Sequence, residues 1–267
     1  LTMAALSNDR FLLGLGVSGP QVVEGLQGRP FEGPLTRLRE TIEIIRLAFQ
    51  GEKLAYQGKY HNLPLPGGEG KALRLAQPGN QEIPIYLATL GPRALELTGE
   101  LADGWLGTSF TPTYANAHLD FISRGAEAKG RSLDDIDIQA GGTVAFEADM
   151  DGVMDSLKAG LAFTLGAMGS AKTNFYNDAY KRGGWEDAAN EVQGLWVAGR
   201  REEAIAKVPE EMVLQSNLVG DEKAIRERLV AYKRAGVSTL RVQPAGQNMD
   251  DQLKTLGATI DLIADLD

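Results

Sequence analysis

Residues 83–105 read IPIYLATLGPRALELTGELADGW, and this stretch decides the fold class. Its apolar start, 83–88, predicts a buried strand. Pro92 follows the turn and predicts the first position of a helix over 92–101, because the N–H group that proline lacks has no partner at a helix start. The short run 104–107 (Gly-Trp-Leu-Gly) predicts the next strand. A strand, a helix and a second strand in this order are typical of a parallel βα unit.

The same alternation continues on both sides of this stretch. Strands are also expected at 11–17, 136–146 and 237–242. Helices are expected over 35–49, 114–129, 221–235 and 249–263. Two or three more helices are expected between 151 and 207, with a break at Gly183-Gly184. Residues 11–17 form a nearly continuous apolar run, which predicts a strand covered on both faces.

Five core strands can be counted in this way, whereas a closed (β/α)₈ barrel needs eight. The chain begins with Leu1, and residues 1–6 read as the end of a helix. Three further βα units would fit in roughly 75 residues upstream. We therefore expect a single TIM-like barrel domain over 1–267 that lacks its first three units in this sequence, with a hairpin and loop excursion at about 51–80 and a helical insertion at about 166–215. A five-stranded open sheet is the alternative.

The composition limits the classes of function. The formal net charge of -9 disfavours nucleic acid and anionic membranes as partners. No apolar run is long enough to predict a membrane-spanning helix. The absence of cysteine excludes disulfides and thiolate chemistry, and it fits a cytoplasmic location. With only two histidines, His61 and His118, a histidine-based metal site is poorly supported. We expect His61 to make a surface or hairpin contact.

The turn at 88–92 is the first candidate binding site. Gly91 leaves room for close approach of a ligand, and the first N–H groups of the following helix favour a phosphate or another anion. The alternative is an ordinary βα turn, because Gly-Pro is common at a helix start.

The second candidate is the glycine-rich strand end that contains Gly14, Gly16 and Gly19. Glycines at the carboxyl end of a barrel strand allow a flat ring to lie against the backbone. We do not interpret them as a dinucleotide fingerprint, because they are taken to lack the G-x-G-x-x-G spacing and no helix is expected to open directly after them.

Three segments together resemble a known family. They are DRFLLGLGVS (9–18), the stretch from Gly91-Pro92 to Asp103-Gly104-Trp105, and MGSAKTNFYN (168–177). The first two are similar to motifs of the luciferase-like monooxygenase superfamily. The third resembles a stretch of its coenzyme F420-dependent branch, the group that contains methylenetetrahydromethanopterin reductase. The resemblance covers nearly the whole chain, in order.

This resemblance implies a (β/α)₈ barrel that binds its coenzyme at the carboxyl ends of the strands. The backbone of Ala88, Thr89, Leu90, Gly91 and Pro92 would hold the phosphate side of the coenzyme. Gly16, Val17 and Ser18 would line its ring system or its side chain. The expected function is hydride transfer between coenzyme F420 and a small organic substrate, in a protein that pairs as a homodimer.

Two other functions stay open. One is an FMN-dependent monooxygenase of the same fold, and the other is a non-catalytic ligand-binding or structural homologue. Sugar-phosphate dehydrogenases of the F420 branch carry a lysine in the loop after the "ADG" strand, whereas residues 108–114 here are uncharged, which disfavours a phosphorylated sugar. The acidic residue and strained peptide that the family's early strands supply have no counterpart in this sequence, so no catalytic residue is named.

Polar residues of the expected helical insertion form a third candidate group. Lys172, Asn174 and Tyr176 would line the substrate side of the site, because clustered polar groups often orient a ligand. Equally, these side chains would fix one helix to the next. The sequence does not separate the two roles.

Overall fold

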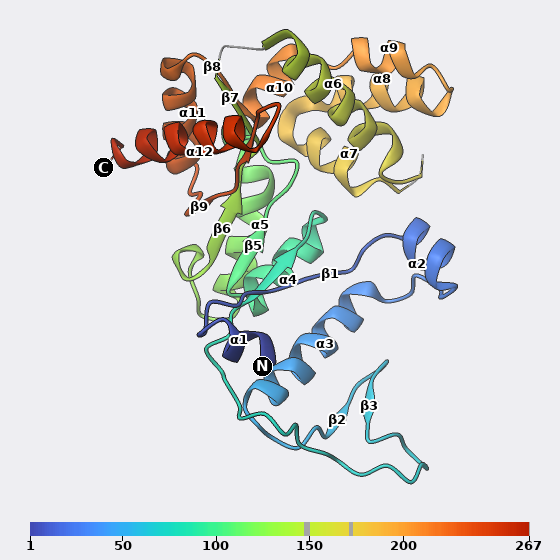
Figure 1. Cartoon of the computed structure of the whole chain (residues 1–267). Helices are drawn as coiled ribbons and strands as arrows, with labels where there is room; N and C mark the ends of the chain where they lie inside the picture. Colours follow the sequence, from blue (N-terminus) through green and yellow to red (C-terminus); the bar gives the residue numbers. More distant parts are fainter. Residues whose placement is uncertain (147–149, 171–172, 267) are drawn as a thin grey trace. The chain divides into compact units, whose positions relative to one another are not determined.

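The computed structural model describes residues 1–146, 150–170 and 173–266 (Figure 1). The chain divides into two compact units, and it passes from one to the other several times. The first unit consists of Leu1–Thr89, Arg93–Leu106 and Phe121–Ile136; the second consists of Leu90–Pro92, Gly107–Asp120 and Asp137–Asp267. The single barrel domain over 1–267, with its excursion at about 51–80 and its insertion at about 166–215, stays a prediction.

The first unit is organised around three parallel strands. They are β1 (Leu13–Gly16), β4 (Ile85–Ala88) and β5 (Gly104–Leu106). The register pairs Gly14 with Tyr86 and Gly16 with Ala88. Because side chains alternate between the two faces of a sheet, paired residues of neighbouring parallel strands share a face.

One face of these strands is the core of the first unit. Three helices contribute to it: α1 (Thr2–Leu6), α3 (Pro34–Phe49) and α4 (Pro92–Leu101). The buried residues of this cluster are Ala4, Leu38, Ile42, Phe49, Ile83, Ile85, Leu87, Leu97 and Ala102. Leu13 and Leu15 of β1 pack against the same cluster. The alternate residues Gly14 and Gly16 are exposed, so the prediction that this strand is covered on both faces is wrong.

A short hairpin follows α3 in the chain (Figure 1). Its strands are β2 (Tyr56–Gln57) and β3 (Asn62–Leu63), paired antiparallel. The buried carboxylate of Glu40 accepts hydrogen bonds from the backbone N–H groups of Lys59, Tyr60 and His61. It also lies 2.9 Å from His61 Nδ1, so His61 makes the hairpin contact that the sequence predicts. Burial raises the pKa of Glu40 but these hydrogen bonds, led by that with His61, bring it below its ordinary value.

Helices α4 and α5 (Asn116–Glu127) touch backbone to backbone through two glycines of the first unit. A β-carbon on Gly99 would collide with the carbonyl oxygen of Ile122, and one on Gly125 would collide with that of Glu96. The two helices can approach this closely only because neither position carries a side chain.

The second unit contains five short parallel strands in two groups. They are β6 (Asp137–Ala140), β7 (Thr143–Phe146), β8 (Leu218–Gly220), β9 (Thr239–Leu240) and β10 (Gln243–Pro244). Strand β6 pairs with β9, whereas β7 lies between β8 and β10. The sequence predicts single strands at 136–146 and 237–242. The first is two strands because Gly141 adopts a φ of 155°, which turns the chain between them.

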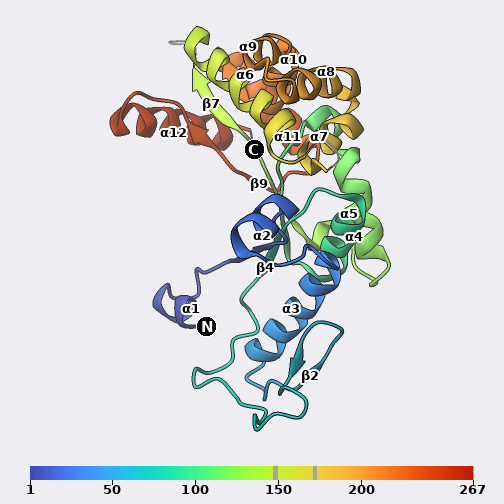
Figure 2. The same ribbon diagram turned by 90° about the vertical axis from the view of Figure 1, so that its right-hand side faces the viewer.

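Most helices of the second unit lie between β7 and β8 in the chain. They are α6 (Met150–Ala167), α7 (Phe175–Tyr180), the π-helical segment η4 (Lys181–Trp185), α8 (Glu186–Val197), α9 (Arg201–Ala206) and α10 (Glu210–Ser216). Helices α6, α8, α9 and α10 gather around a buried apolar cluster (Figure 2). The break predicted at Gly183-Gly184 is present, since both residues leave helical geometry.

Two short 3₁₀ turns precede β6 in the described chain. They are η1 (Pro112–Tyr114) and η2 (Leu133–Asp135).

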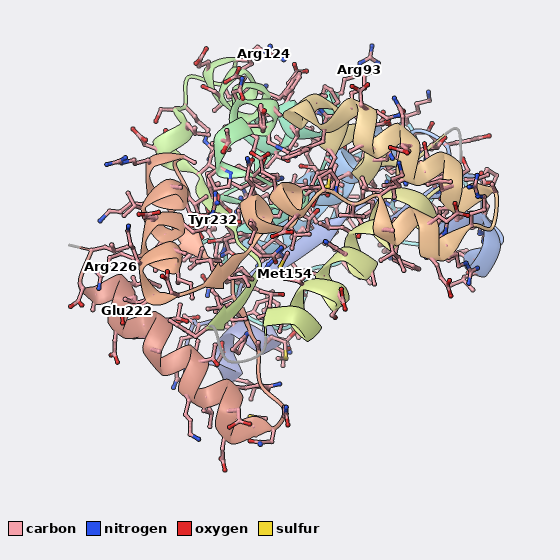
Figure 3. All side chains as sticks on the ribbon, turned by 90° about the horizontal axis from the view of Figure 1, so that it is seen from above. Arg93, Arg124, Met154, Glu222, Arg226 and Tyr232 are labelled. Carbon is pink, nitrogen blue, oxygen red and sulfur yellow. The ribbon has the colours of Figure 1, made fainter. Side chains whose placement is uncertain are left out.

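Two helices complete the second unit, α11 (Glu222–Arg234) and α12 (Met249–Ala264). Arg226 of α11 forms ion pairs with Glu222, one turn earlier, and with Asp265, which follows α12 (Figure 3). Helix α12 forms where the sequence predicts a helix over 249–263; Met249 at its start is exposed, and the helix buries Thr259 and Leu262.

The expectation that no helix follows the glycine-rich strand is also wrong. Helix α2 (Pro20–Gln27) opens directly after Gly19, and Gly14, Gly16 and Gly19 do have the G-x-G-x-x-G spacing. In dinucleotide-binding proteins the third glycine permits close packing of the helix on the strand. Helix α2 buries none of its residues, and α3 intervenes before the next parallel strand. The structure therefore gives no support to a dinucleotide fingerprint here.

None of the helices in the described part of the chain is both long and apolar enough to cross a membrane.

The α4–α5 contact yields a test of the fold. Gly99→Ala should lower the free energy of unfolding by about 1–3 kcal/mol, because the added methyl group forces two backbones apart. In Gly194→Ala the methyl group meets no atom within 4 Å, so this helical control should gain about 0.5–1 kcal/mol. Denaturant unfolding measures both values, and equal effects of the two substitutions would contradict the contact.

Candidate functional site

The carboxyl ends of β1 and β4 present small residues on one face, beside the side chain of Leu106, whose Cδ1 lies 3.2 Å from where a β-carbon on Gly14 would stand. We call Gly14, Gly16 and Ala88 the small-residue face; all three are exposed. The register that pairs Gly16 with Ala88 places these two residues side by side at the strand ends. A β-carbon on Gly16 would lie 3.4 Å from the carbonyl oxygen of Ala88. The face therefore offers exposed backbone and one methyl group, which suits a flat ring.

Tyr86 shares this face but does not block it. A β-carbon on Gly104 would collide with the Tyr86 ring, so the ring lies across the neighbouring strand β5. Tyr86 is itself buried, with 7% of its surface exposed. Gly104 thus keeps the largest side chain of this face away from the strand ends.

The two residues after Gly16 differ in what they offer a ligand. The side chain of Val17 packs against the apolar core of the first unit, which leaves its backbone for binding. Ser18 is exposed and has a φ of 59°, a conformation that residues other than glycine seldom adopt. Such strain is often found at ligand-binding positions. Of this pair, Ser18 is the better candidate for a side-chain contact.

The Asp103-Gly104-Trp105 segment holds β4 and the start of its loop. Asp103 Oδ2 accepts a hydrogen bond from the backbone N–H of Ile85, with 2.7 Å between the heavy atoms. The indole N–H of Trp105, which is fully buried, donates to the carbonyl oxygen of Thr89 at 3.0 Å. The Thr89 hydroxyl is also buried and lies 2.7 Å from that of Thr98 in α4. Thr89 is therefore fixed within the first unit and does not offer its side chain to a ligand.

The next three residues, Leu90, Gly91 and Pro92, belong to the second unit. The carbonyl oxygen of Leu90 accepts a hydrogen bond from Arg182 Nη2 at 2.5 Å. A β-carbon on Gly91 would have no atom within 4 Å, so there is open space beside this residue. Pro92 is exposed and is the first residue of α4, as the sequence predicts. Arg93, the next residue, is also exposed (Figure 3).

The loop after β5 is also part of the second unit, and buried aromatic residues hold it. Phe110 lies between His118 and Tyr232, with ring-centroid distances of 5.9 and 6.0 Å. The Tyr232 hydroxyl donates to the carbonyl oxygen of Ser216 at 3.1 Å. The neighbouring Ser109 has a φ of 51°, so the loop contains a strained residue close to these aromatic contacts.

His118 lies on α5 inside this cluster and is 1% exposed. Burial, followed by the positive charge of Arg182, lowers the pKa of His118 to about 4. The imidazole is therefore neutral near pH 7.

The three residues expected on the substrate side have separate outcomes. Lys172 lies outside the described residues. Asn174 is 4% exposed; its side chain accepts from the N–H groups of Tyr176 and Asn177 and donates to the carbonyl oxygen of Leu165. It caps α7 and ties it to α6, which favours the structural alternative for this residue. Tyr176 is half-buried, and its substrate contact stays a prediction.

Two functional candidates were missed by sequence reasoning. Arg182 is separated from Leu90 by 92 residues, and no motif spacing links them. The only signal was its position beside the predicted break at Gly183-Gly184. The second is Trp105, because no local sequence signal indicates that its indole N–H would hold the Thr89 carbonyl group.

Each unit offers one feature that suits a ligand group. In the first unit, the small-residue face suits a flat ring. The turn with Gly91 supplies open space next to a helix start, where anions are favoured. Among the described residues, no group of three histidine, aspartate or glutamate side chains could hold a metal ion.

Comparison with known proteins supports the resemblance noted in the sequence. Residues 1–239 match the family described as luciferase-like monooxygenase. A protein of Mycobacterium tuberculosis named as a coenzyme F420-dependent oxidoreductase is 37% identical over 97% of this chain and 76% of its own length. The 5,10-methylenetetrahydromethanopterin reductase of Methanopyrus kandleri is 26% identical over 97% of this chain and 75% of its own.

The fold is also that of solved relatives. The structure of coenzyme F420-dependent tetrahydromethanopterin reductase from Methanopyrus kandleri superposes with a TM-score of 0.70 and 25% identity, over 95% of this chain and 73% of that one. The predicted fold class, the luciferase-like (β/α)₈ type, is therefore confirmed.

The buried imidazole yields a pH prediction. Because the folded protein favours neutral His118, the unfolded chain takes up the proton first as the pH falls through about 6.5. The free energy of unfolding should therefore decrease by up to about 3 kcal/mol as the pH falls from 6.5 to 4. Above pH 6.5 His118 is neutral in both states, so the full stability should be present there.

Denaturant unfolding at several pH values, in the wild type and in His118→Asn, measures the difference in slope. An NMR titration of His118 with a midpoint near 6.5 would contradict the prediction.

Proposed function

Because the chain belongs to the luciferase-like monooxygenase family, we propose that it is an F420-dependent oxidoreductase that transfers a hydride between the deazaflavin coenzyme and a small organic substrate. The observation that carries the proposal is the small-residue face at the carboxyl ends of two parallel strands. In barrels of this type, ligands bind at that end of the strands.

The residues present fit such a coenzyme. A flat tricyclic ring needs a surface with little projecting bulk, and Gly16 and Ala88 provide one at the carboxyl ends of β1 and β4, bordered at Gly14 by the side chain of Leu106. A phosphate needs N–H donors and space, and the turn at Gly91 has open space on the side where a β-carbon would stand. We assign the ring to the small-residue face and the phosphate to the Leu90–Pro92 turn.

When bound, coenzyme F420 supplies a ring carbon that accepts or donates a hydride and that reacts poorly with oxygen. The chain's part is to bind and orient. The small-residue face allows the ring to lie flat, Ser18 lies beside it at the strand end, and the Leu90–Pro92 turn holds the anionic part. We assign no acid or base.

Substrate, location and assembly are proposals of the same kind. The loop from Thr108 to Tyr114 contains no charged residue, which favours an uncharged organic substrate over a phosphorylated sugar. The absence of cysteine supports a cytoplasmic location. We propose a homodimer, and light scattering of the purified protein measures its mass directly.

Coenzyme titration tests the function. Quenching of coenzyme fluorescence should report tight binding of F420 and much weaker binding of FMN. The reverse order would favour the FMN-dependent monooxygenase. Binding of neither would overturn the proposal and leave a non-catalytic homologue.

Gly16→Val tests the ring position. The branched side chain would stand on the small-residue face, so F420 affinity should fall at least tenfold, equivalent to about 1.4 kcal/mol, with little change in unfolding free energy. Gln57→Val places the same side chain on an exposed position of β2 and should leave the affinity unchanged. Equal affinities in the two variants would exclude this face as the ring site.

A further inference from the structure

Arg182 makes a long-range contact to the turn that contains Gly91. Its Nη2 donates to the carbonyl oxygen of Leu90 at 2.5 Å, and its Nη1 donates to that of Asp178 at 3.2 Å. The side chain is half-buried, and its Nε atom is buried without a hydrogen-bond partner among the described residues. The guanidinium is thus held between a helix backbone and the turn.

The π-helical segment η4 sets the position of Arg182. Gly184 adopts a φ of 82°, and a β-carbon there would collide with the ring of Tyr114. The next residue, Trp185, packs edge-on against the same ring, with 6.5 Å between ring centroids. Here the segment is packed against the loop after β5, which fixes where the guanidinium can reach.

A hydrogen bond to the Leu90 carbonyl also fixes the direction of the next N–H group. The peptide unit is planar and trans, so its C=O and N–H point in opposite directions. The N–H of this unit belongs to Gly91. Because Gly91 lacks a β-carbon, the turn could otherwise rotate this peptide at little cost. With the carbonyl held by Arg182, the N–H is directed away from the guanidinium.

The side of Gly91 on which a β-carbon would stand is open space. No atom lies within 4 Å of the position where its β-carbon would stand. A charged donor on one side of a peptide also polarises it, which makes its N–H a stronger donor on the other side. The Leu90–Gly91 peptide is thus prepared to donate to an anion.

We propose that Arg182 is a positioning residue for the coenzyme: it fixes the Leu90–Gly91 peptide so that the Gly91 N–H donates to the coenzyme's phosphate. This inference rests on the proposed F420-dependent function. Arg182 acts through the backbone and not on the reacting atoms, since its contact with the turn is to a backbone carbonyl.

Two ligands separate positioning from a general structural role. Fluorescence titration should use F420 and, in parallel, its deazariboflavin fragment, which keeps the ring and the ribityl chain but lacks the phosphate. Arg182→Met should weaken F420 binding about tenfold and leave the binding of the fragment within twofold of wild type. Arg182→Lys keeps the charge and should fall between Met and wild type. Arg200→Met removes an exposed arginine paired with Glu203 and should change neither affinity.

A readout on the unliganded protein makes the test independent of coenzyme binding. In glycine-labelled protein the amide signal of Gly91 can be assigned by its loss in Gly91→Ala. In Arg182→Met this signal should shift and its hydrogen exchange should accelerate, whereas in Arg200→Met it should stay in place. Thermal unfolding of each variant establishes that it is folded.

Each outcome decides a separate point. An unmoved Gly91 amide in folded Arg182→Met would overturn the proposal, because the peptide would not depend on the guanidinium. A shifted amide with unchanged F420 affinity would also overturn it, since the held peptide would not serve the phosphate. Equal losses for F420 and the fragment would assign Arg182 a structural role only. If the wild type binds no F420 while the Gly91 amide still shifts in Arg182→Met, the proposed function fails, and the role of Arg182 toward the coenzyme fails with it. The contact between Arg182 and Leu90 would then still stand.

Discussion

The site depends on one constraint, the parallel register between β1 and β4. This register pairs Gly14 with Tyr86 and Gly16 with Ala88. A shift of β4 by one residue would turn that strand's other face outward, because side chains alternate along a strand. Ile85 and Leu87 would then stand on the exposed face. Burial of Ile85 and Leu87, which are 0% exposed, makes such a shift costly, so the core fixes the small-residue face.

The Asp103-Gly104-Trp105 segment supports this arrangement at three points. Asp103 accepts the backbone N–H of Ile85 at the start of β4, Gly104 accommodates the Tyr86 ring, and Trp105 donates to the carbonyl oxygen of Thr89 beyond its end. These contacts explain why this tripeptide follows the helix after β4. Its members act on the neighbouring strand, and none of the three contacts is with a ligand.

Two successive carbonyl groups of the turn are held by side chains that are remote in sequence. Trp105 holds that of Thr89 within the first unit, and Arg182 holds that of Leu90 within the second. A flexible turn that contains glycine would otherwise have to be ordered when the ligand binds. Fixing it in advance reduces the entropy lost on binding. The aromatic packing of Tyr114 and Trp185 around η4 serves the same end, since it fixes the helix from which Arg182 extends.

The sequence by itself determined the features that arise from local spacing and from motifs. The strand at 83–88, the proline that opens α4, the break at Gly183-Gly184 and the family all follow from residues close together in the chain. Only the tertiary structure decided which face of β1 is exposed, where 136–146 divides into two strands, and that Arg182 reaches Leu90 across 92 residues. Periodicity reports the alternation of side chains but not what covers each face. A contact between distant segments depends on how the whole chain packs, and no local pattern encodes it.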